Sequence, residues 1–147
     1  MAKLRSGEPW MPAAEFGRSL EGVSVNLIVR DVARSVPFYR DVLGFQLLYS
    51  DPDYAAFDRD GFKLQLHADH TWEHMPWAER LAEGPRGLGA ELRLLGVEPD
   101  AAERRARELG FRVHLGTRER AGHGWRECYL EDPDGYLWAV GTAITAI

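Results

Sequence analysis

Polar side chains that could bind a metal ion or a small ligand alternate with apolar residues in two short segments of the chain. In the segment 62–67, Gln65 and His67 alternate with leucines, and further along the chain Glu91 and Arg93 do the same. Successive side chains of a strand point to opposite faces of a sheet, so each polar pair is expected to share one face. Imidazole and carboxylate groups bind divalent cations, and all four side chains can form hydrogen bonds. The pattern predicts two polar strand faces that could hold an ion or a polar molecule.

Further residues complete the candidate ligand-binding set. Trp125 follows a glycine-rich loop, and its indole, like the ring of Tyr54, offers a flat surface for stacking or for cation–π contact. Glu127 would add negative charge close to Trp125, and Asn26 would add hydrogen bonds from the first strand. The whole candidate set is Asn26, Tyr54, Gln65, His67, Glu91, Arg93, Trp125 and Glu127, and no catalytic residue is assigned.

The elements that must position these residues follow the order β-α-β-β-β in the first half of the chain. β-branched residues predict a strand over 23–29, and Asp31 offers the cap of a helix that ends at Gly44. Pro37 is compatible with this helix only near its first turn. The remaining strands, separated by turn residues, are predicted over 45–49, 54–57 and 62–67.

The second half of the chain repeats that order. It predicts a strand over 90–95, a helix over 99–109 and strands over 111–114, 125–130 and 136–141. Asp100 and Glu103 have the spacing of a capping box at the start of the helix. Leu43-Gly44-Phe45 recurs as Leu109-Gly110-Phe111, each where a helix ends and a strand begins. The repetition indicates a duplicated module.

We therefore expect an α+β protein built from two tandem βαβββ modules. The modules span 23–67 and 90–142, are joined by 68–89, and form a single domain over 21–147. Residues 1–20, which mix prolines with Trp10 and Phe16, are expected to form an extension that packs against the body or a partner, with at most one short helical turn. In the connection between the modules, His70 and His74 are expected to be solvated.

Composition disfavours several classes of function. The chain has 147 residues with 18 basic and 23 acidic side chains, and its net charge of −5 disfavours binding to nucleic acid or to an anionic membrane. Its N-terminus has no apolar signal segment, and no stretch approaches the ~20 apolar residues of a membrane span. The single cysteine, Cys128, cannot form an internal disulfide and is expected in the core. A cytoplasmic protein without nucleic-acid or membrane partners is expected.

Two stretches of the sequence resemble a known superfamily. One contains Val29-Arg30-Asp31 through Ser35, then Phe38-Tyr39-Arg40-Asp41 and Leu43-Gly44-Phe45, and the other is Tyr129-Leu130-Glu131-Asp132-Pro133-Asp134-Gly135-Tyr136. They resemble the opening strand–helix signature and the closing acidic turn of the vicinal oxygen chelate superfamily, also called the glyoxalase, bleomycin-resistance and extradiol dioxygenase group. The residues around Trp125 resemble the bleomycin-resistance branch.

The resemblance implies two modules whose curved mixed sheets surround a cleft. In metal-dependent members, four ligands from four strands hold a divalent ion that chelates vicinal substrate oxygens. In bleomycin-resistance members there is no metal, and a homodimer sequesters a planar, cationic drug in grooves with aromatic walls.

The ligand positions that the resemblance implies fall on Ser24, Gln65, Glu91 and Ala139. Only Glu91 is a strong ligand, because Gln65 is a weak neutral donor and an alanine offers none. We therefore expect no metal and no other cofactor at the standard position. The alternative is a relocated site for a divalent ion that uses His67 and Glu91, with His114 as a further ligand.

Residues and resemblance together favour a non-enzymatic, small-molecule binding protein of the bleomycin-resistance type, with a role in antibiotic resistance. It would be a homodimer that holds a planar, cationic ligand in its cleft without chemistry. The alternative is a metal-dependent enzyme of the same superfamily, either a glyoxalase-like lyase or isomerase or an extradiol-type dioxygenase. A third possibility is a partner-binding module with an empty cleft.

Overall fold

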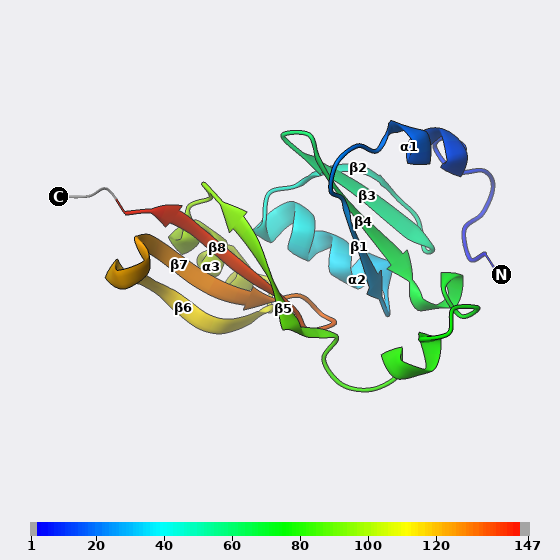
Figure 1. Cartoon of the computed structure of the whole chain (residues 1–147). Helices are drawn as coiled ribbons and strands as arrows, with labels where there is room; N and C mark the ends of the chain where they lie inside the picture. Colours follow the sequence, from blue (N-terminus) through cyan, green and yellow to red (C-terminus); the bar gives the residue numbers. More distant parts are fainter. Residues whose placement is uncertain (1–2, 145–147) are drawn as a thin grey trace. The chain divides into compact units, whose positions relative to one another are not determined.

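A computed structural model describes residues 3–144. The chain divides into two compact units, one made of residues 1–40 and 44–83 and the other of residues 41–43 and 84–147. Each unit contains a four-stranded mixed sheet and an α-helix that packs on it (Figure 1).

The first unit forms its sheet in the order β1-β4-β3-β2. The chain up to residue 83 contains α1 (Ala13–Ser19), β1 (Val25–Val29), α2 (Val32–Pro37), a π-helical turn (Phe38–Val42), β2 (Gln46–Ser50), β3 (Tyr54–Arg59), β4 (Phe62–Ala68) and 3-10 turns at Asp69–Thr71 and Ala78–Leu81. β1 runs parallel to β4, and the other neighbouring strands are antiparallel. α2 packs against β2, β3 and β4.

The second unit repeats this topology with the strand order β5-β8-β7-β6. Its elements are β5 (Gly87–Leu95), α3 (Pro99–Glu108), β6 (Arg112–Arg120), a 3-10 turn (Ala121–His123), β7 (Trp125–Glu131) and β8 (Tyr136–Ala143). β5 is parallel to β8, as β1 is to β4, and α3 packs on β6, β7 and β8. The predicted α+β class and the two tandem βαβββ modules are confirmed.

The first helix begins as the sequence predicts but changes its winding. The Asp31 carboxylate accepts a hydrogen bond from the Arg34 N–H at 3.3 Å and caps α2. Pro37 lies in the last turn of α2, so the expectation that it lies near the first turn is wrong. Because proline cannot donate a helical hydrogen bond, the regular winding ends there and the chain widens into the π-helical turn Phe38–Val42. Gly44, at φ +77°, then ends the helical segment.

Some predicted boundaries are wrong. β1 begins at Val25, and Val23, placed in the strand by its β-branched side chain, is 81% exposed. β6 extends to Arg120, well beyond the predicted end at residue 114. Register shifts in its pairing with β7 break the alternation of apolar and polar residues, which hides the strand from pattern analysis.

The capping box predicted for α3 is also wrong. The cap is Glu98, whose carboxylate accepts from the Asp100 N–H at 3.3 Å, and Pro99 occupies the first helical position. Glu103 instead accepts a hydrogen bond from the Thr117 N–H on β6 and pairs with Arg107 at 3.0 Å. This carboxylate therefore joins the helix to its sheet rather than closing the first turn.

Apolar side chains of β4 and β8 form part of the core. Leu64 and Leu66 of β4 are fully buried, as is Val140 of β8. Cys128 is buried as predicted, with its sulfur 3.6 Å from the Pro99 carbonyl oxygen. Burial raises the pKa of the Cys128 thiol to about 11.

The N-terminal extension is more ordered than expected. Residues Ala13–Ser19 form α1, a helix of seven residues rather than a single turn, and Phe16 is its buried residue. Within residues 3–144 no helix has both the length and the apolar character needed to cross a bilayer.

Candidate functional site

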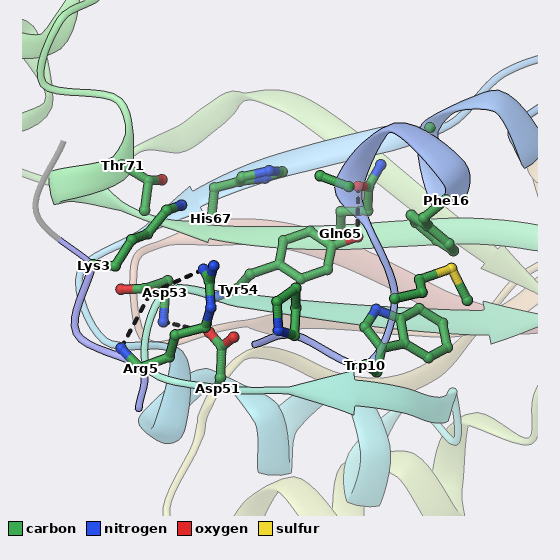
Figure 2. Close-up of a pocket in the computed structure, with 14 residues that line it drawn as sticks. Lys3, Arg5, Trp10, Phe16, Asp51, Asp53, Tyr54, Gln65, His67 and Thr71 are labelled. Atoms are coloured by element: carbon green, nitrogen blue, oxygen red, sulfur yellow. Dashed lines mark hydrogen bonds and ion pairs between the residues drawn. The ribbon is translucent and has the colours of Figure 1, made fainter. Parts of the chain in front are cut away.

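A pocket of about 340 Å³ lies in the first unit, between the N-terminal extension and the sheet (Figure 2). Its lining residues come from the extension, from the loop before β3, from β3 and β4, and from the 3-10 turn that follows β4. They are Lys3, Arg5, Pro9, Trp10, Met11, Ala13, Phe16, Gly17, Asp51, Asp53, Tyr54, Gln65, His67 and Thr71.

The sheet side of the pocket is built by strand register. Tyr54 of β3 pairs with His67 of β4, and Gln65 lies two residues before His67, so the three side chains share one face. The Tyr54 hydroxyl donates to Oε1 of Gln65 at 2.7 Å, and the Tyr54 and His67 rings meet edge to face with centroids 5.0 Å apart. The opposite face of the same strands carries the core leucines and receives α2. One face of the sheet is thus a core surface and the other a pocket floor.

Aromatic rings from the extension form the facing wall. The Trp10 indole stacks on the Tyr49 ring at 5.6 Å, with an interplanar angle of 8°. Phe16 of α1 contacts Trp10 at 5.4 Å and the edge of Tyr54 at 6.5 Å. The pocket is therefore bordered by flat apolar surfaces from two distant parts of the sequence.

One carboxylate joins the extension to the sheet. Asp53, 1% exposed, accepts hydrogen bonds from the backbone N–H of Leu4 at 2.8 Å and of Arg5 at 3.2 Å. The Arg5 guanidinium lies 3.6 Å from this carboxylate, and Nε2 of His70 lies 2.6 Å from it. Burial alone would raise the pKa of Asp53, but these hydrogen bonds and the His70 ring hold that pKa below its usual range. The expectation that His70 is simply solvated is wrong.

The titratable groups on the pocket floor keep their neutral forms. Burial, with a smaller contribution from the Lys3 charge, lowers the pKa of His67 to about 4. Burial also raises the pKa of the Tyr54 hydroxyl well above its usual value. At neutral pH His67 is an uncharged imidazole and Tyr54 an uncharged phenol. His67 Nδ1 is buried and has no hydrogen-bond partner among residues 3–144.

The candidate residues of the second unit form an ion-pair network on its sheet. Arg93 contacts Glu91 at 2.6 Å and Glu127 at 3.0 Å. Glu127, 2% exposed, also accepts a hydrogen bond from the Tyr129 hydroxyl at 3.1 Å. The Arg93 guanidinium lies 5.9 Å from the Trp125 ring centroid, a cation–π distance. Much of the polar capacity of these groups is already used by one another.

The predicted site residues thus separate into two groups. Tyr54, Gln65 and His67 line the pocket of the first unit. Asn26 shares their face by its pairing with Gln65 but is exposed and does not line the pocket. The other four, Glu91, Arg93, Trp125 and Glu127, belong to the second unit.

Sequence reasoning missed the pocket residues supplied by the extension and by the loop before β3. Trp10 and Phe16 gave a usable signal, since paired aromatic residues in a short extension need a surface on which to pack. Asp53 gave none, because an aspartate next to a proline is typical of a turn. Asp53 acts through contacts with Leu4 and Arg5, which lie 49 and 48 positions earlier in the chain.

The residues at the implied metal positions do not make a ligand set. Ser24 is exposed and precedes β1, Oε1 of Gln65 accepts the Tyr54 hydrogen bond, and Ala139 has no donor atom. Glu91 is paired with Arg93. In the proposed relocated site, His114 lies 3.3 Å from Glu131, and His67 packs between Tyr54 and Trp72. Across residues 3–144, no three His, Cys, Asp or Glu side chains converge as a metal site.

Residues 23–140 match the Glyoxalase/Bleomycin resistance protein/Dioxygenase superfamily, and the chain belongs to this superfamily. The N-terminal wall of the pocket lies outside the matched residues.

Three known proteins are similar to this chain in sequence or in structure. The uncharacterized protein YraH of Bacillus subtilis (strain 168) is 26% identical over 118 residues, which cover 78% of this chain and 92% of that protein. The crystal structure of a glyoxalase/bleomycin resistance protein/dioxygenase from Nocardioides is 22% identical, with a TM-score of 0.66 over 91% of this chain and 94% of that one. A glyoxalase-related enzyme from Fulvimarina pelagi is 20% identical, with a TM-score of 0.66 over 84% and 88% of the two chains. The two solved structures show the fold, the superfamily rests on the match over residues 23–140, and none of these similarities singles out a branch.

Proposed function

We propose that the protein binds a planar, cationic small molecule in the pocket of its first unit and sequesters it without chemical change. The observation that carries the proposal is the convergence of the Trp10, Phe16 and Tyr54 rings on one pocket. Aromatic faces provide large, stiff contact areas and attract a cation through their quadrupoles.

The charge of the ligand is argued from the wider chain. Lys3 and Arg5 balance Asp51 and Asp53 in the pocket lining, so the formal charges of these four residues cancel. The net charge of −5 favours the approach of a cation, and the aromatic faces favour it at contact.

Binding without chemistry is consistent with the groups on the pocket floor. A general base works best when its pKa lies near the operating pH, and that of His67 is about 4. Tyr54 retains its proton, and the Gln65 amide does not titrate. Sequestration of this kind would place the protein with the bleomycin-resistance members of its superfamily.

Calorimetric titration with matched planar dyes tests the proposal. Proflavine, a planar cation, is expected to bind with about one molecule per chain, whereas 9-anthracenecarboxylate, a planar anion, is expected to bind at least about tenfold more weakly. Trp10→Ala should weaken proflavine binding, since a base or ring stacked on an aromatic side chain contributes about 1–3 kcal/mol. Trp77→Ala, which removes an exposed indole outside the pocket lining, is the control.

Metal analysis separates sequestration from the enzymatic alternative. Protein purified without chelator is expected to contain less than stoichiometric metal, and EDTA should leave proflavine binding unchanged. One tightly bound divalent ion per chain would overturn the proposal in favour of a metal-dependent enzyme of the superfamily.

A further inference from the structure

We propose that Asp53 latches the N-terminal extension onto the sheet, so that residues 3–17 form a pocket wall whose position controls ligand binding. Asp53 is a positioning residue in this proposal, because it acts through the extension. The part that concerns ligand binding rests on the proposed function, whereas the latch itself does not.

The latch is built from contacts that converge on one buried carboxylate. Both carboxylate oxygens are engaged by the extension, Oδ1 by the Leu4 N–H and Oδ2 by the Arg5 N–H. The Arg5 guanidinium and the His70 ring add positive or polar groups around it. A buried carboxylate is costly unless it is paired and hydrogen-bonded, so loss of the extension would leave Asp53 poorly satisfied. Binding of the extension to Asp53 therefore satisfies both the backbone N–H groups of the extension and the buried carboxylate.

Other elements hold Asp53 in place for this role. Oδ1 of Asp51 accepts hydrogen bonds from the N–H groups of Asp53 and Tyr54 at 2.7 and 2.8 Å, which fixes the turn before β3. The Ala68 N–H donates to the Asp53 carbonyl at 2.9 Å, at the end of β4. The sheet therefore presents the carboxylate on a rigid turn.

The wall itself has little intrinsic stability. α1 has seven residues, and a helix of that length is marginal on its own in water. The order of the wall therefore rests on the latch at Leu4 and Arg5 and on the packing of the Trp10 and Phe16 rings. Release of the Asp53 contacts would free Lys3 and Arg5 from the pocket edge and loosen the aromatic wall that follows them in the chain.

Hydrogen exchange of the full-length protein without ligand tests the latch directly. Asp53→Asn should speed exchange of the Leu4 and Arg5 amides at least about tenfold, since a hydrogen bond to a charged group contributes about 1.5–3 kcal/mol. Asp58→Asn is the matched control, because Asp58 pairs with Lys63 at 2.8 Å on the same sheet and does not line the pocket. Unchanged exchange in Asp53→Asn would overturn the latch.

A second pair of variants leaves the sheet intact. Leu4 lies in the extension with 64% of its surface exposed, and Leu4→Pro removes the N–H that bonds Asp53 while Leu4→Ala retains it. Leu4→Pro should speed exchange of the Arg5 amide at least about fivefold, and Leu4→Ala should not. Equal behaviour of the two variants would overturn the role of that hydrogen bond.

Proflavine titration of the same variants tests the wall. Asp53→Asn and Leu4→Pro should each weaken binding at least about fivefold relative to Asp58→Asn and Leu4→Ala. Faster exchange with unchanged proflavine affinity would overturn control of the pocket by the latch. If the unsubstituted protein binds neither dye, the proposed function fails, while the exchange result still decides the latch.

Discussion

The Tyr54 hydroxyl donates a 2.7 Å hydrogen bond to Oε1 of Gln65, and this contact joins β3 to β4 at the floor of the pocket. Gln65 is 7% exposed, so its oxygen has little access to water. The same Tyr54 ring contacts Phe16 of the extension. One side chain therefore links the fixed floor of the pocket to its wall.

Substitution of Tyr54 separates ring area from hydrogen bonding. Tyr54→Phe should lower the free energy of unfolding by about 1–2 kcal/mol, because the buried Gln65 oxygen loses its donor. Proflavine affinity should fall less than about threefold in Tyr54→Phe but more than about tenfold in Tyr54→Ala, which removes the ring. Urea unfolding and calorimetric titration measure the two effects. Equal loss of affinity in both variants would show that the hydrogen bond, not the ring, governs binding.

Stability should fall between pH 6.5 and pH 4 because of His67. Its pKa drops from 6.5 to about 4 in the folded protein, so over this range the unfolded chain binds a proton that the folded chain refuses. The stabilisation is complete above pH 6.5 and decreases by up to about 3 kcal/mol as the pH falls to 4. His67→Gln should flatten this part of the profile in urea unfolding. An unchanged profile in His67→Gln would contradict this assignment.

The two carboxylates that share Arg93 should differ sharply in their effect on stability. Glu127 is buried, so Glu127→Gln should destabilise the protein by about 1–3 kcal/mol as its arginine and tyrosine partners lose a charged acceptor. Glu91 is 37% exposed and screened by water, and Glu91→Gln should cost at most about 0.5 kcal/mol. Thermal unfolding of both variants provides the comparison. Equal losses of stability in Glu127→Gln and Glu91→Gln would show that burial does not determine how much each carboxylate contributes.

Gly141 occupies a position in β8 where a side chain has no room. A Cβ there would lie 2.6 Å from the Arg126 carbonyl oxygen and 2.9 Å from Cβ of Glu127. Gly141→Ala should therefore force β7 and β8 apart and cost more than about 2 kcal/mol. A Cβ at Gly89 of β5 would meet no atom of residues 3–144 within 4 Å, so Gly89→Ala should be neutral or slightly stabilising. Unfolding in urea distinguishes them, and a neutral Gly141→Ala would show that the strands can separate freely.

Short-range sequence patterns were sufficient to predict the fold. Alternation placed Gln65 and His67 on one face of a strand, and helix-to-strand glycines such as Gly44 marked the repeat. These features depend on neighbours a few residues apart, so they survive in a single sequence. The length of β6 was underestimated because irregularities in its pairing with β7 remove the alternation of apolar and polar residues on which strand prediction depends.

The candidate site was only partly predictable, and the reason is distance along the chain. Strand periodicity predicted a shared face for Gln65 and His67, and Tyr54 was predicted only as an aromatic contact; all three line the pocket. Asp53 and Trp10, in contrast, are positioned by contacts between the extension and the sheet. No periodicity encodes such contacts. The protonation of His67 likewise depends on burial by the surrounding structure, not on its immediate sequence neighbours.

The wall of the pocket precedes residue 23, where the match to the superfamily begins. Changes in Trp10 or Phe16 can therefore reshape the cavity without altering any strand of either sheet. Transplanting the first twenty residues between related proteins would be a direct way to engineer new ligand preferences. An affinity tag at the N-terminus would be attached close in sequence to Lys3, which lines the pocket, so fusion at the other end is the safer choice for binding experiments.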